Sequence, residues 1–452
     1  MTNVGDERPP PPDAAPMSPL DRVLRIVGDV RGGEGRTALT LGATVFVLLG
    51  AYYLLKVARE ALLLSSFEAE VKVYVAAAQA ALLIPAVSAF GWLSTHVGRV
   101  RLVTISTLFF ASHLVVFAVL YGMDVEIGIA FYVWVGVFNV FVISQFWTFA
   151  NDVYTEEQGR RLFAVIGLGS ATGAIAGSYG AAPIGDAIGT MGILLVSAAL
   201  VVSTLLGIRW AHARSKGDDA PASRKPSGRG AFRLLLSDRY LILIAVMMLL
   251  LNQVNTIGEY VLDRVMQDEL RADVIAAGLE ASMSDALEGR VRDFKSEYFF
   301  WFNTIALVLQ LFVVGRVMAK GGAGLAIVVL PIVALLGQGA MALSGAALLV
   351  VTGAKIAENS VDYSLQNTGR NALFLIMPHE VKYRVKPLVD SVLMRVGDMF
   401  AGGLVLVGTG VLAIPTLGFV AVNAAVTVVW AGVAIALARE HRRRAEARPG
   451  GR

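Results

Sequence analysis

The amino-acid sequence predicts an all-α polytopic membrane protein with about twelve transmembrane helices in two six-helix lobes. Hydrophobic residues occupy 56% of the 452 positions, charged residues only 16%, and the mean hydropathy is +0.65. A soluble domain has roughly a quarter of its residues charged, so the main solvent of this chain is lipid. The apolar residues form long separate runs, and a polar loop divides these runs into two halves.

A helix needs about 20 apolar residues to cross the hydrocarbon core of a bilayer. Runs of this kind predict spans at 38–64, 70–94, 101–121, 126–150, 161–181, 188–210, 238–264, 296–318, 323–344, 346–368, 388–411 and 414–438. Only helical bundles and closed barrels satisfy the backbone polar groups in lipid, and runs of this length are helices.

The Lys and Arg residues of the connecting loops predict the orientation of the chain. They gather on one side, in the loops after the second and fourth spans, in the central loop at 214–233 and in the tail from Arg442 to Arg444. The short loops of the other side carry Asp124, Glu126 and Asp186. We therefore expect both termini and the central loop in the cytoplasm, and the chain in the inner (plasma) membrane.

The same pattern divides the chain into successive parts. These are a disordered or amphipathic cytoplasmic tail at 1–36, an N-terminal six-helix lobe at 37–211, a cytoplasmic linker at 212–236, a C-terminal six-helix lobe at 237–438 and a basic cytoplasmic tail at 439–452. Residues 263–297 mix acidic and basic residues at helical spacing and predict one or two short helices on the outer side. Residues 20–27 fit an amphipathic helix on the cytoplasmic leaflet or, alternatively, a frayed tail.

Composition also excludes several function classes. The chain has no cysteine, which excludes disulfides and thiolate chemistry. The net charge of +4 comes from loops between apolar runs, so we expect no nucleic-acid partner. The five histidines are scattered, only His113 lies in a predicted span, and no nucleophile–base arrangement occurs. We therefore expect no metal, no cofactor and no enzymatic activity.

The first span carries a polar stripe. Tyr52, Tyr53, Lys56, Arg59 and Glu60 recur at i, i+1, i+4, i+7 and i+8 and share one helix face. A charge at mid-span costs about 3 kcal/mol on insertion scales, so such residues face the bundle interior and find partners. Two cations beside two rings suit an anionic ligand with a flat ring, because cations pair with phosphates and rings stack on bases. The alternative is a structural network that ties this span to its neighbours.

The seventh span carries Asn252, Asn255, Glu259 and Asp263 on one face. Glu259 is the deepest acid there, and we expect it to balance a first-span cation across a central cavity or to bind a proton. Asp263 lies near the outer end of the span, where we expect it to be solvated.

The tenth span has a third polar stripe, formed by Lys355, Glu358, Asn359, Asp362, Tyr363 and Gln366. Lys355 and Glu358 can pair within the helix, and the alternative is that the stripe contributes to a substrate site. In the eleventh span, Arg395 and Asp398 are one turn apart and predict a local ion pair, with a gate role as the alternative. Gate or structural roles are expected for Arg99, Arg101, Asn151, Asp152, Lys386, Asp390, Arg395 and Asp398.

Two loops resemble each other across the halves. GWLSTHVGRVR (91–101) follows the second span and GRVMAKGGAG (315–324) follows the eighth, each with two glycines seven positions apart beside basic residues. The first loop resembles the cytoplasmic loop signature of the major facilitator superfamily. Five positions match, namely Gly91, Leu93, Gly98, Arg99 and Arg101, whereas the usual acidic position is Thr95.

Three longer runs resemble the ATP/ADP translocases of plastids and obligate intracellular bacteria. They are LLKVAREALLLSS (54–66), FWTFANDVYTEEQGRRLFAVIGLGSATGAIAGS (146–178) and DYSLQNTGRNALFLIMPHEVKYRVKPLVDSV (362–392). That family exchanges nucleotides and has a major-facilitator-like fold. The resemblance implies that its first-span Lys–Asp pair falls on Arg59 and Glu60, its seventh-span acid on Glu259, and its Lys-x-x-x-Asp motif on Lys386 and Asp390.

The chain also departs from that family. The family's fourth-span acid falls on Val135, and two of its lysines fall on Asp362 and Asp398. Losing cations and gaining acids should weaken the binding of a polyphosphate. The fold and the transport role are therefore expected to carry over better than the ATP/ADP specificity.

The sequence thus predicts a monomeric, bilayer-embedded secondary transporter that exchanges nucleotides or a related small organic anion by alternating access. Its expected substrate residues are Tyr53, Lys56, Arg59, Glu60, Asn255, Glu259, Lys355, Glu358 and Asp362. One alternative is a proton-coupled carrier of another organic solute, which depends on Glu259. A second is a non-transporting membrane scaffold or sensor, in which the first-span charges tolerate neutral replacement.

Overall fold

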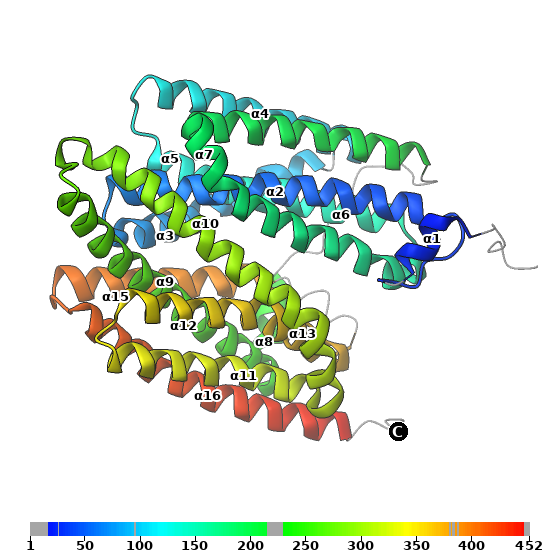
Figure 1. Ribbon diagram of the computed structural model, residues 1–452. Helices are drawn as coiled ribbons and strands as arrows, with labels where there is room; N and C mark the ends of the chain where they lie inside the picture. Colours follow the sequence, from blue (N-terminus) through cyan, green and yellow to red (C-terminus); the bar gives the residue numbers. More distant parts are fainter. Residues whose placement is uncertain are drawn as a thin grey trace, which may run out of the picture.

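The computed structural model describes residues 17–25, 27–94, 96–214, 229–378, 381, 385–386 and 388–446. All regular elements within these ranges are helical, and they form two bundles that lie side by side (Figure 1). The first bundle, the N-lobe, contains α1 to α7. The second bundle, the C-lobe, contains α8 to α16.

The N-lobe is built from long apolar helices. Its elements are α1 (Pro19–Leu24), α2 (Gly35–Ser66), α3 (Ala69–Ser94), α4 (Arg99–Gly122), α5 (Gly128–Phe138), the π-helix η1 (Asn139–Ile143), α6 (Ser144–Val153) and α7 (Glu156–Arg214).

The C-lobe repeats this plan with more interruptions. Its elements are α8 (Arg229–Leu236), α9 (Arg239–Ala276), η2 (Glu280–Ser282), α10 (Met283–Leu309), η3 (Gln310–Val314), α11 (Gly315–Leu343), α12 (Leu348–Val361), η4 (Asp362–Gln366), α13 (Asn367–Leu373), η5 (Phe374–Ile376), η6 (Val389–Leu393), α15 (Met394–Gly410) and α16 (Thr416–Glu446). A π-helical turn interrupts three of these spans, at η3, η4 and η6. The α5–α6 span of the N-lobe contains a fourth such turn, at η1.

Two continuous helical stretches double back at a single glycine. The chain turns within α7 at Gly189 (φ 68°, ψ 178°) and within α11 at Gly322 (φ 61°, ψ −163°), and Figure 1 shows both reversals. A positive φ strains any residue with a Cβ, so glycine is the residue suited to these turns. Gly322 belongs to the glycine-rich loop that the sequence singled out.

The described helices account for the predicted spans. Eight continuous helical stretches among them are long and apolar enough to cross a membrane. Two of the eight contain the reversals at Gly189 and Gly322 and supply two passes each, and the stretches 348–373 and 389–410 supply the remaining passes. The prediction of an all-α membrane fold with two six-helix lobes is confirmed.

The α7 helix packs directly on the backbone of α2. A Cβ added at Gly169, Gly173 or Gly177 would overlap a main-chain carbonyl oxygen of α2, from Gly42, Phe46 or Gly50 respectively. Glycines spaced four apart allow such an approach. This contact holds the first span, with its charged stripe, against the fifth span.

The outer segment 263–297 differs from the expected short external helices. Instead, α9 continues to Ala276 and α10 starts at Met283, so this segment consists of extensions of two spans joined by a short connection. The sequence predicted a solvated Asp263, but its side chain is only 1% exposed.

The residues before the first span are neither frayed nor detached. Ser18 and Asp21 form a capping box at the start of α1, and Asp21 accepts hydrogen bonds from the backbone N–H groups of Gly33 (3.3 Å) and Gly35 (2.9 Å). This short helix therefore packs on the start of α2. Residues 1–16 of the predicted tail at 1–36 lie outside the described residues.

Candidate functional site

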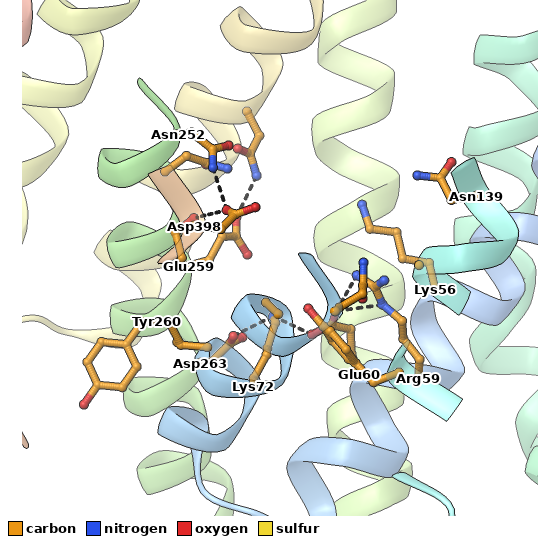
Figure 2. Close-up of a pocket in the computed structure, with 18 of the residues that line it drawn as sticks. Lys56, Arg59, Glu60, Lys72, Asn139, Asn252, Glu259, Tyr260, Asp263 and Asp398 are labelled. Atoms are coloured by element: carbon orange, nitrogen blue, oxygen red, sulfur yellow. Dashed lines mark hydrogen bonds and ion pairs between the residues drawn. The ribbon is translucent and has the colours of Figure 1, made fainter. Parts of the chain in front are cut away.

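A cavity of about 310 Å³ lies between the two lobes (Figure 2). A volume near 300 Å³ is at the lower end of the range for small-molecule sites. Polar and aromatic side chains from both lobes line it: Tyr52, Lys56, Arg59, Glu60, Lys72, Gln79, Tyr132 and Asn139 from the N-lobe, and Asn252, Asn255, Thr256, Glu259, Tyr260, Asp263, Phe299, Phe302, Asn359, Tyr363, Arg395 and Asp398 from the C-lobe.

The stripe predicted on the first span faces this cavity. Lys56 lies against aromatic rings, with its Nζ 4.3 Å from the ring centre of Phe299, 5.1 Å from that of Tyr53 and 5.6 Å from that of Phe302. No carboxylate in the described part of the chain forms an ion pair with it. Lys56 is thus a cavity lysine whose ammonium group packs against ring faces.

Arg59 follows one turn later on the same face. Its guanidinium lies 4.4 Å from the ring centre of Tyr132, and its Nη2 is 3.1 Å from Glu60 Oε1. The side chain is 12% exposed, whereas Glu60 is only 2% exposed. Arg59 therefore pairs with the Glu60 carboxylate and still lines the cavity.

Tyr53, one of the expected substrate residues, does not line the cavity. Its ring packs edge-on against Phe299, and its hydroxyl donates a hydrogen bond to Asn303 Oδ1 at 3.1 Å. Asn303 belongs to α10, so this contact joins the two lobes. Helical periodicity placed Tyr53 on the stripe, but it lies at the edge of that face, next to α10.

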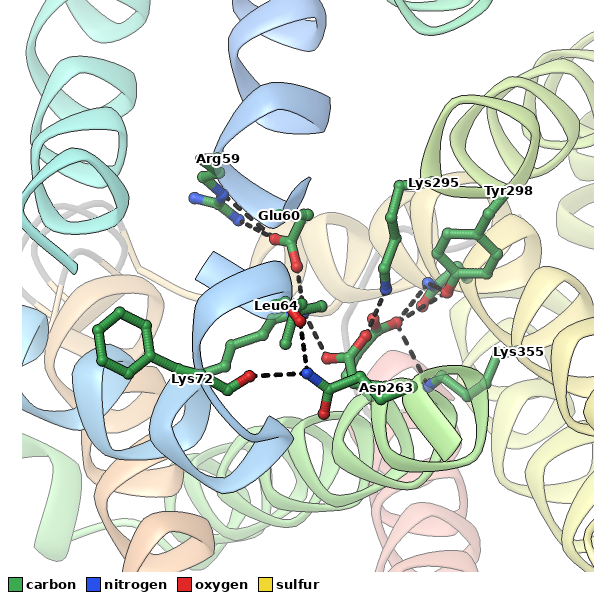
Figure 3. Close-up of polar contacts among 12 residues, drawn as sticks. Arg59, Glu60, Leu64, Lys72, Asp263, Lys295, Tyr298 and Lys355 are labelled. Carbon is green, nitrogen blue, oxygen red and sulfur yellow. Dashed lines mark hydrogen bonds and ion pairs between the residues drawn. The ribbon is translucent and has the colours of Figure 1, made fainter. Parts of the chain in front are cut away.

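Two lysines absent from the predicted site complete a network at one end of the cavity (Figure 3). Lys72 of α3 lies between Glu60 Oε2 (2.5 Å) and Asp263 Oδ2 (2.6 Å). Lys295 of α10 pairs with the other oxygen of Asp263 and is fully buried. The chain of contacts from Arg59 to Lys295 therefore links α2 and α3 of the N-lobe to α9 and α10 of the C-lobe.

The sequence held a signal for both lysines. Lys72 lies inside the predicted second span, and Lys295 immediately precedes the predicted eighth span. Charges at span ends usually reach the headgroup region, so such lysines look ordinary. Lys295 is buried because α10 starts at Met283, before the apolar run, and Lys72 is mostly covered because it contacts Asp263 of α9, which continues to Ala276.

Glu259 lines the cavity from α9. Its Oε1 accepts hydrogen bonds from the Tyr298 hydroxyl (2.8 Å) and from Asn359 Nδ2 (2.9 Å), and it lies 3.9 Å from Lys355 Nζ. Neither Lys56 nor Arg59 pairs with it among these contacts. The contacts that hold the Glu259 carboxylate, from Tyr298, Asn359 and Lys355, therefore all come from the C-lobe.

The tenth-span stripe divides between the cavity and the interior of the C-lobe. Asn359 and Tyr363 line the cavity, whereas Lys355, Glu358 and Asp362 do not. Lys355 is fully buried and donates to Glu358 Oε2 (2.8 Å) and to Asn255 Oδ1 (3.1 Å). The pairing within the helix, one of the two alternatives, is present, and these three residues lie outside the cavity lining.

Arg395 and Asp398 line the cavity from α15. They form the expected local ion pair at 3.3 Å. Asp398 Oδ1 also accepts hydrogen bonds from Asn252 Nδ2 (2.5 Å) and Thr256 Oγ1 (3.0 Å) of α9. This acid is therefore part of the polar wall rather than an isolated gate residue.

The other predicted gate residues lie outside the cavity lining. Arg101 near the start of α4 and Asn151 near the end of α6 are exposed, and Asn151 donates to the Trp147 carbonyl oxygen at 2.9 Å. The side chain of Arg99 lies outside the described residues. Asp152, Lys386 and Asp390 are partly exposed near the ends of α6 and η6.

We call the end of the molecule that contains α1, α8 and the C-terminal end of α16 the linker face, and the opposite end the far face. Contacts between the lobes gather at the far face. Glu288 of α10 accepts hydrogen bonds from the hydroxyl groups of Tyr121 (3.1 Å) and Thr190. Three ion pairs also join the lobes, namely Arg292 with Asp186, Arg271 with Glu68 (2.8 Å) and Arg264 with Glu70 (3.2 Å). Gln267 donates to the carbonyl oxygens of Leu64 and Phe67, both at 2.7 Å. The far face is thus closed by side chains from both lobes.

At the linker face, the ion pairs among the described residues stay within each lobe. Arg161 of α7 binds both carboxylate oxygens of Glu34, at 2.8 and 2.9 Å, and Arg444 of α16 binds both oxygens of Asp238 at 2.8 Å. Burial alone would raise the pKa of Glu34, but the hydrogen bonds and charge of Arg161 outweigh it and hold that pKa below its usual value. The hydrogen bonds from Arg444 lower the pKa of Asp238 in the same way.

Comparisons with known proteins identify the fold. No family model matches the chain, and no curated protein matches its sequence. Solved structures of transporters do match in shape. A bacterial homologue of the iron transporter ferroportin in its inward-facing state gives a TM-score of 0.61 at 11% identity, covering 88% of this chain and 98% of that one.

Two further matches are the POT family transporter PepTSo and an inward-facing bacterial homologue of the lysosomal transporter Spinster. PepTSo gives a TM-score of 0.56 at 11% identity, over 91% of this chain and 98% of its own. The Spinster homologue gives 0.54 at 12% identity, over 90% and 98%. These similarities show the major-facilitator-like fold.

Proposed function

We propose that this protein is a secondary membrane transporter that works by alternating access. The observation that carries the proposal is the charged cavity, which receives side chains from both lobes and is closed at the far face by contacts between them. Rocking the lobes apart at the far face would break those contacts and expose the same cavity to the other side.

The conformation corresponds to a carrier open toward the linker face. The contacts between the lobes at the far face, and the ion pairs of the linker face that stay within each lobe among the described residues, support this assignment. The Lys and Arg residues of the linker and of the C-terminal tail favour a cytoplasmic linker face. Both termini would then be cytoplasmic, in a bacterial-type inner membrane.

For the substrate we propose a small organic anion with a flat ring, of which a nucleotide is one example. Lys56 and Arg59 supply positive charge, and Tyr52, Tyr132 and Phe299 supply ring faces. The lining also contains four acids, Glu60, Glu259, Asp263 and Asp398, against four cations, Lys56, Arg59, Lys72 and Arg395. This balance favours an anion of low charge over a polyphosphate such as ATP.

Uptake into proteoliposomes tests the proposal. A panel of radiolabelled AMP, ADP, ATP and aromatic carboxylates would be offered outside vesicles loaded with the same compounds. We expect exchange of at least one low-charge member, and a large loss of uptake in Arg59→Ala. The matched control is Arg209→Ala, because Arg209 is an exposed arginine of α7.

Two outcomes would overturn the proposal. One is the absence of uptake for every panel member, and the other is uptake by Arg59→Ala equal to that by Arg209→Ala. Tolerance of neutral residues at both Lys56 and Arg59 would instead favour the scaffold or sensor alternative.

A proton-coupled carrier is a second candidate function. The observation in its favour is that several carboxyl groups lie inside the C-lobe within the membrane, at Glu259, Glu358, Asp362 and Asp398. Buried ionisable residues in spans commonly serve proton relays. A pH gradient that drives accumulation of the solute would distinguish this carrier from an obligate exchanger.

A further inference from the structure

A second, much smaller pocket lies inside the C-lobe, behind the wall of the central cavity. Its volume is about 10 Å³, and α9, α11, α12, η4 and α16 surround it. Its polar lining consists of Asn255, Glu358, Asn359, Asp362 and Trp430. A space of roughly 10–15 Å³ that meets polar groups holds a single water molecule.

Trp430 presents an unpaired donor at this pocket. The residue is 2% exposed, and its indole Nε1–H finds no acceptor among the described residues. A buried N–H group without an acceptor is rare, because its desolvation is not compensated. A bound water would accept a hydrogen bond from this indole N–H and could bridge it to a carboxyl oxygen.

Asp362 differs from the acids of the central cavity. Glu60, Glu259, Asp263 and Asp398 each bind a cationic or hydrogen-bonding side chain. Asp362 has no such partner in the described part of the chain. It is also the first residue of the π-helical turn η4, and π-helical turns inside α-helices occur frequently at functional sites.

The charges around Asp362 do not neutralise it. Glu358 lies one turn before it, and that carboxylate already takes the charge of Lys355 at 2.8 Å. The charged side chains that act on Asp362 are Glu358, Lys355 and Arg370, while α11 and α16 contribute Leu330, Ala334 and Trp430. Two carboxylates one turn apart, with one cation bound to the first, favour a proton on the second.

The small pocket adjoins the central cavity. Asn255 and Asn359 line both spaces, and Asn359 also donates to Glu259 at 2.9 Å. A proton at Asp362 is therefore one layer of side chains away from the proposed substrate site. Its arrival or departure would change the charge felt by Lys355 and Glu259.

We propose that the Asp362 carboxyl group is a proton-binding site that shares a buried water with Trp430 and Glu358. The inference deepens the proposed function by naming the residue that would couple proton movement to transport. The proton occupies a carboxyl oxygen of Asp362, and the water accepts the Trp430 N–H and donates to Glu358. No covalent bond changes other than the O–H bond of the acid.

Infrared spectroscopy of the full-length protein in lipid tests the site without a substrate. A neutral carboxylic acid gives a C=O stretching band that is separate from the bands of carboxylates. We expect such a band at neutral pH in the wild type, its loss in Asp362→Asn, and its persistence in the control Glu259→Gln, because Glu259 is held as a carboxylate by two donors. In Trp430→Phe the band should shift in frequency without disappearing.

Asp362→Glu covers the case in which Asp362→Asn does not fold, and it should keep the band at a changed frequency. The proposal is overturned if wild type and Asp362→Asn have superimposable spectra in this region, or if Glu259→Gln removes the band. Since no solute is needed, these results are independent of the uptake panel. Absence of transport with an intact Asp362 band would reject the proposed function alone.

Discussion

The charged stripes of α2 and α12 have similar patterns in the sequence and different surroundings in the structure. Lys56, Arg59 and Glu60 of α2 face the cavity and the partner lobe, whereas Lys355 and Glu358 of α12 pair inside their own lobe. Arg59 is 12% exposed and Lys355 is fully buried. A polar stripe on an apolar span therefore predicts burial against protein, but it does not tell whether the stripe binds a solute or holds a lobe together.

The largest expected effect is on the stability of the C-lobe. Lys355→Ala would leave Glu358 buried without its cation and would weaken the hold on Glu259. Removing one partner of a buried ion pair costs about 3–5 kcal/mol. We expect a strongly lowered melting temperature in detergent. An unchanged melting temperature would contradict the structural role of the α12 stripe.

Arg59→Ala should act on transport more than on folding. Glu60 keeps Lys72 as a partner at 2.5 Å, so no carboxylate is left unpaired. A lost hydrogen bond to a charged group is worth about 1.5–3 kcal/mol, which corresponds to a roughly 10- to 100-fold higher half-saturating solute concentration. Initial uptake rates over a range of solute concentrations measure this effect. A melting temperature of Arg59→Ala as low as that of Lys355→Ala would contradict the proposed difference between the α2 and α12 stripes.

Lys72→Ala should shift the balance between conformations. Without Lys72, Glu60 still has Arg59 and Asp263 still has Lys295, so each lobe keeps its internal pairs while one contact between the lobes is lost. We expect a shift of about 1–2 kcal/mol toward a state open at the far face, comparable to one charge-assisted hydrogen bond.

Spin labels can report this shift, because the chain has no native cysteine. Cysteines introduced at Met123 of the N-lobe and Leu279 of the C-lobe are exposed positions at the far face. The inter-label distance should lengthen in Lys72→Ala and stay unchanged in Lys320→Ala, which alters an exposed lysine. Equal distances in both variants would show that Lys72 does not hold the far face closed.

The smallest expected effects concern the linker-face pairs. Because the folded-state pKa of Glu34 lies below its usual value, the pair with Arg161 stabilises the fold above that usual pKa, and the stabilisation is lost as pH falls through the folded-state pKa. Glu34→Gln should cost about 1 kcal/mol or less at neutral pH and nothing at acidic pH.

Asp238→Asn should behave in the same way in the C-lobe, since the pKa of Asp238 is also lowered. Melting temperatures of both variants between neutral and acidic pH provide the comparison. A pH-independent loss in either variant would mean that packing, rather than charge, dominates its contribution.

Much of the fold could be predicted from the sequence. Apolar runs determine where helices cross a bilayer, and the glycines at 169, 173 and 177 are spaced four apart, a pattern that allows the close contact with α2 that the structure shows. Except for Tyr53, the residues of the α2 and α9 stripes line one cavity, because helical periodicity determines which side chains share a face.

The site could be predicted only in part. Periodicity does not say which helix lies opposite a face, so Lys355, Glu358 and Asp362 were assigned to a cavity that they do not line. Hydropathy ends a span where charges begin, so Asp263 was placed in solvent and residues 263–297 in short external helices, although α9 and α10 continue through this segment and bury Asp263 and Lys295. Lys72 gains its role only from residues of α2 and α9 that are distant in sequence.

The backbone contact between α7 and α2 has a consequence for how tightly a solute would bind from each side of the membrane. At Gly169, Gly173 and Gly177 the backbones of α7 and α2 are in direct contact, which favours movement of the two helices as one unit. Lys56 and Arg59 therefore keep the same arrangement within the N-lobe, whichever side the cavity faces. A difference in solute affinity between the two sides of the membrane would have to originate in the C-lobe wall, at Glu259, Arg395 or Asp398.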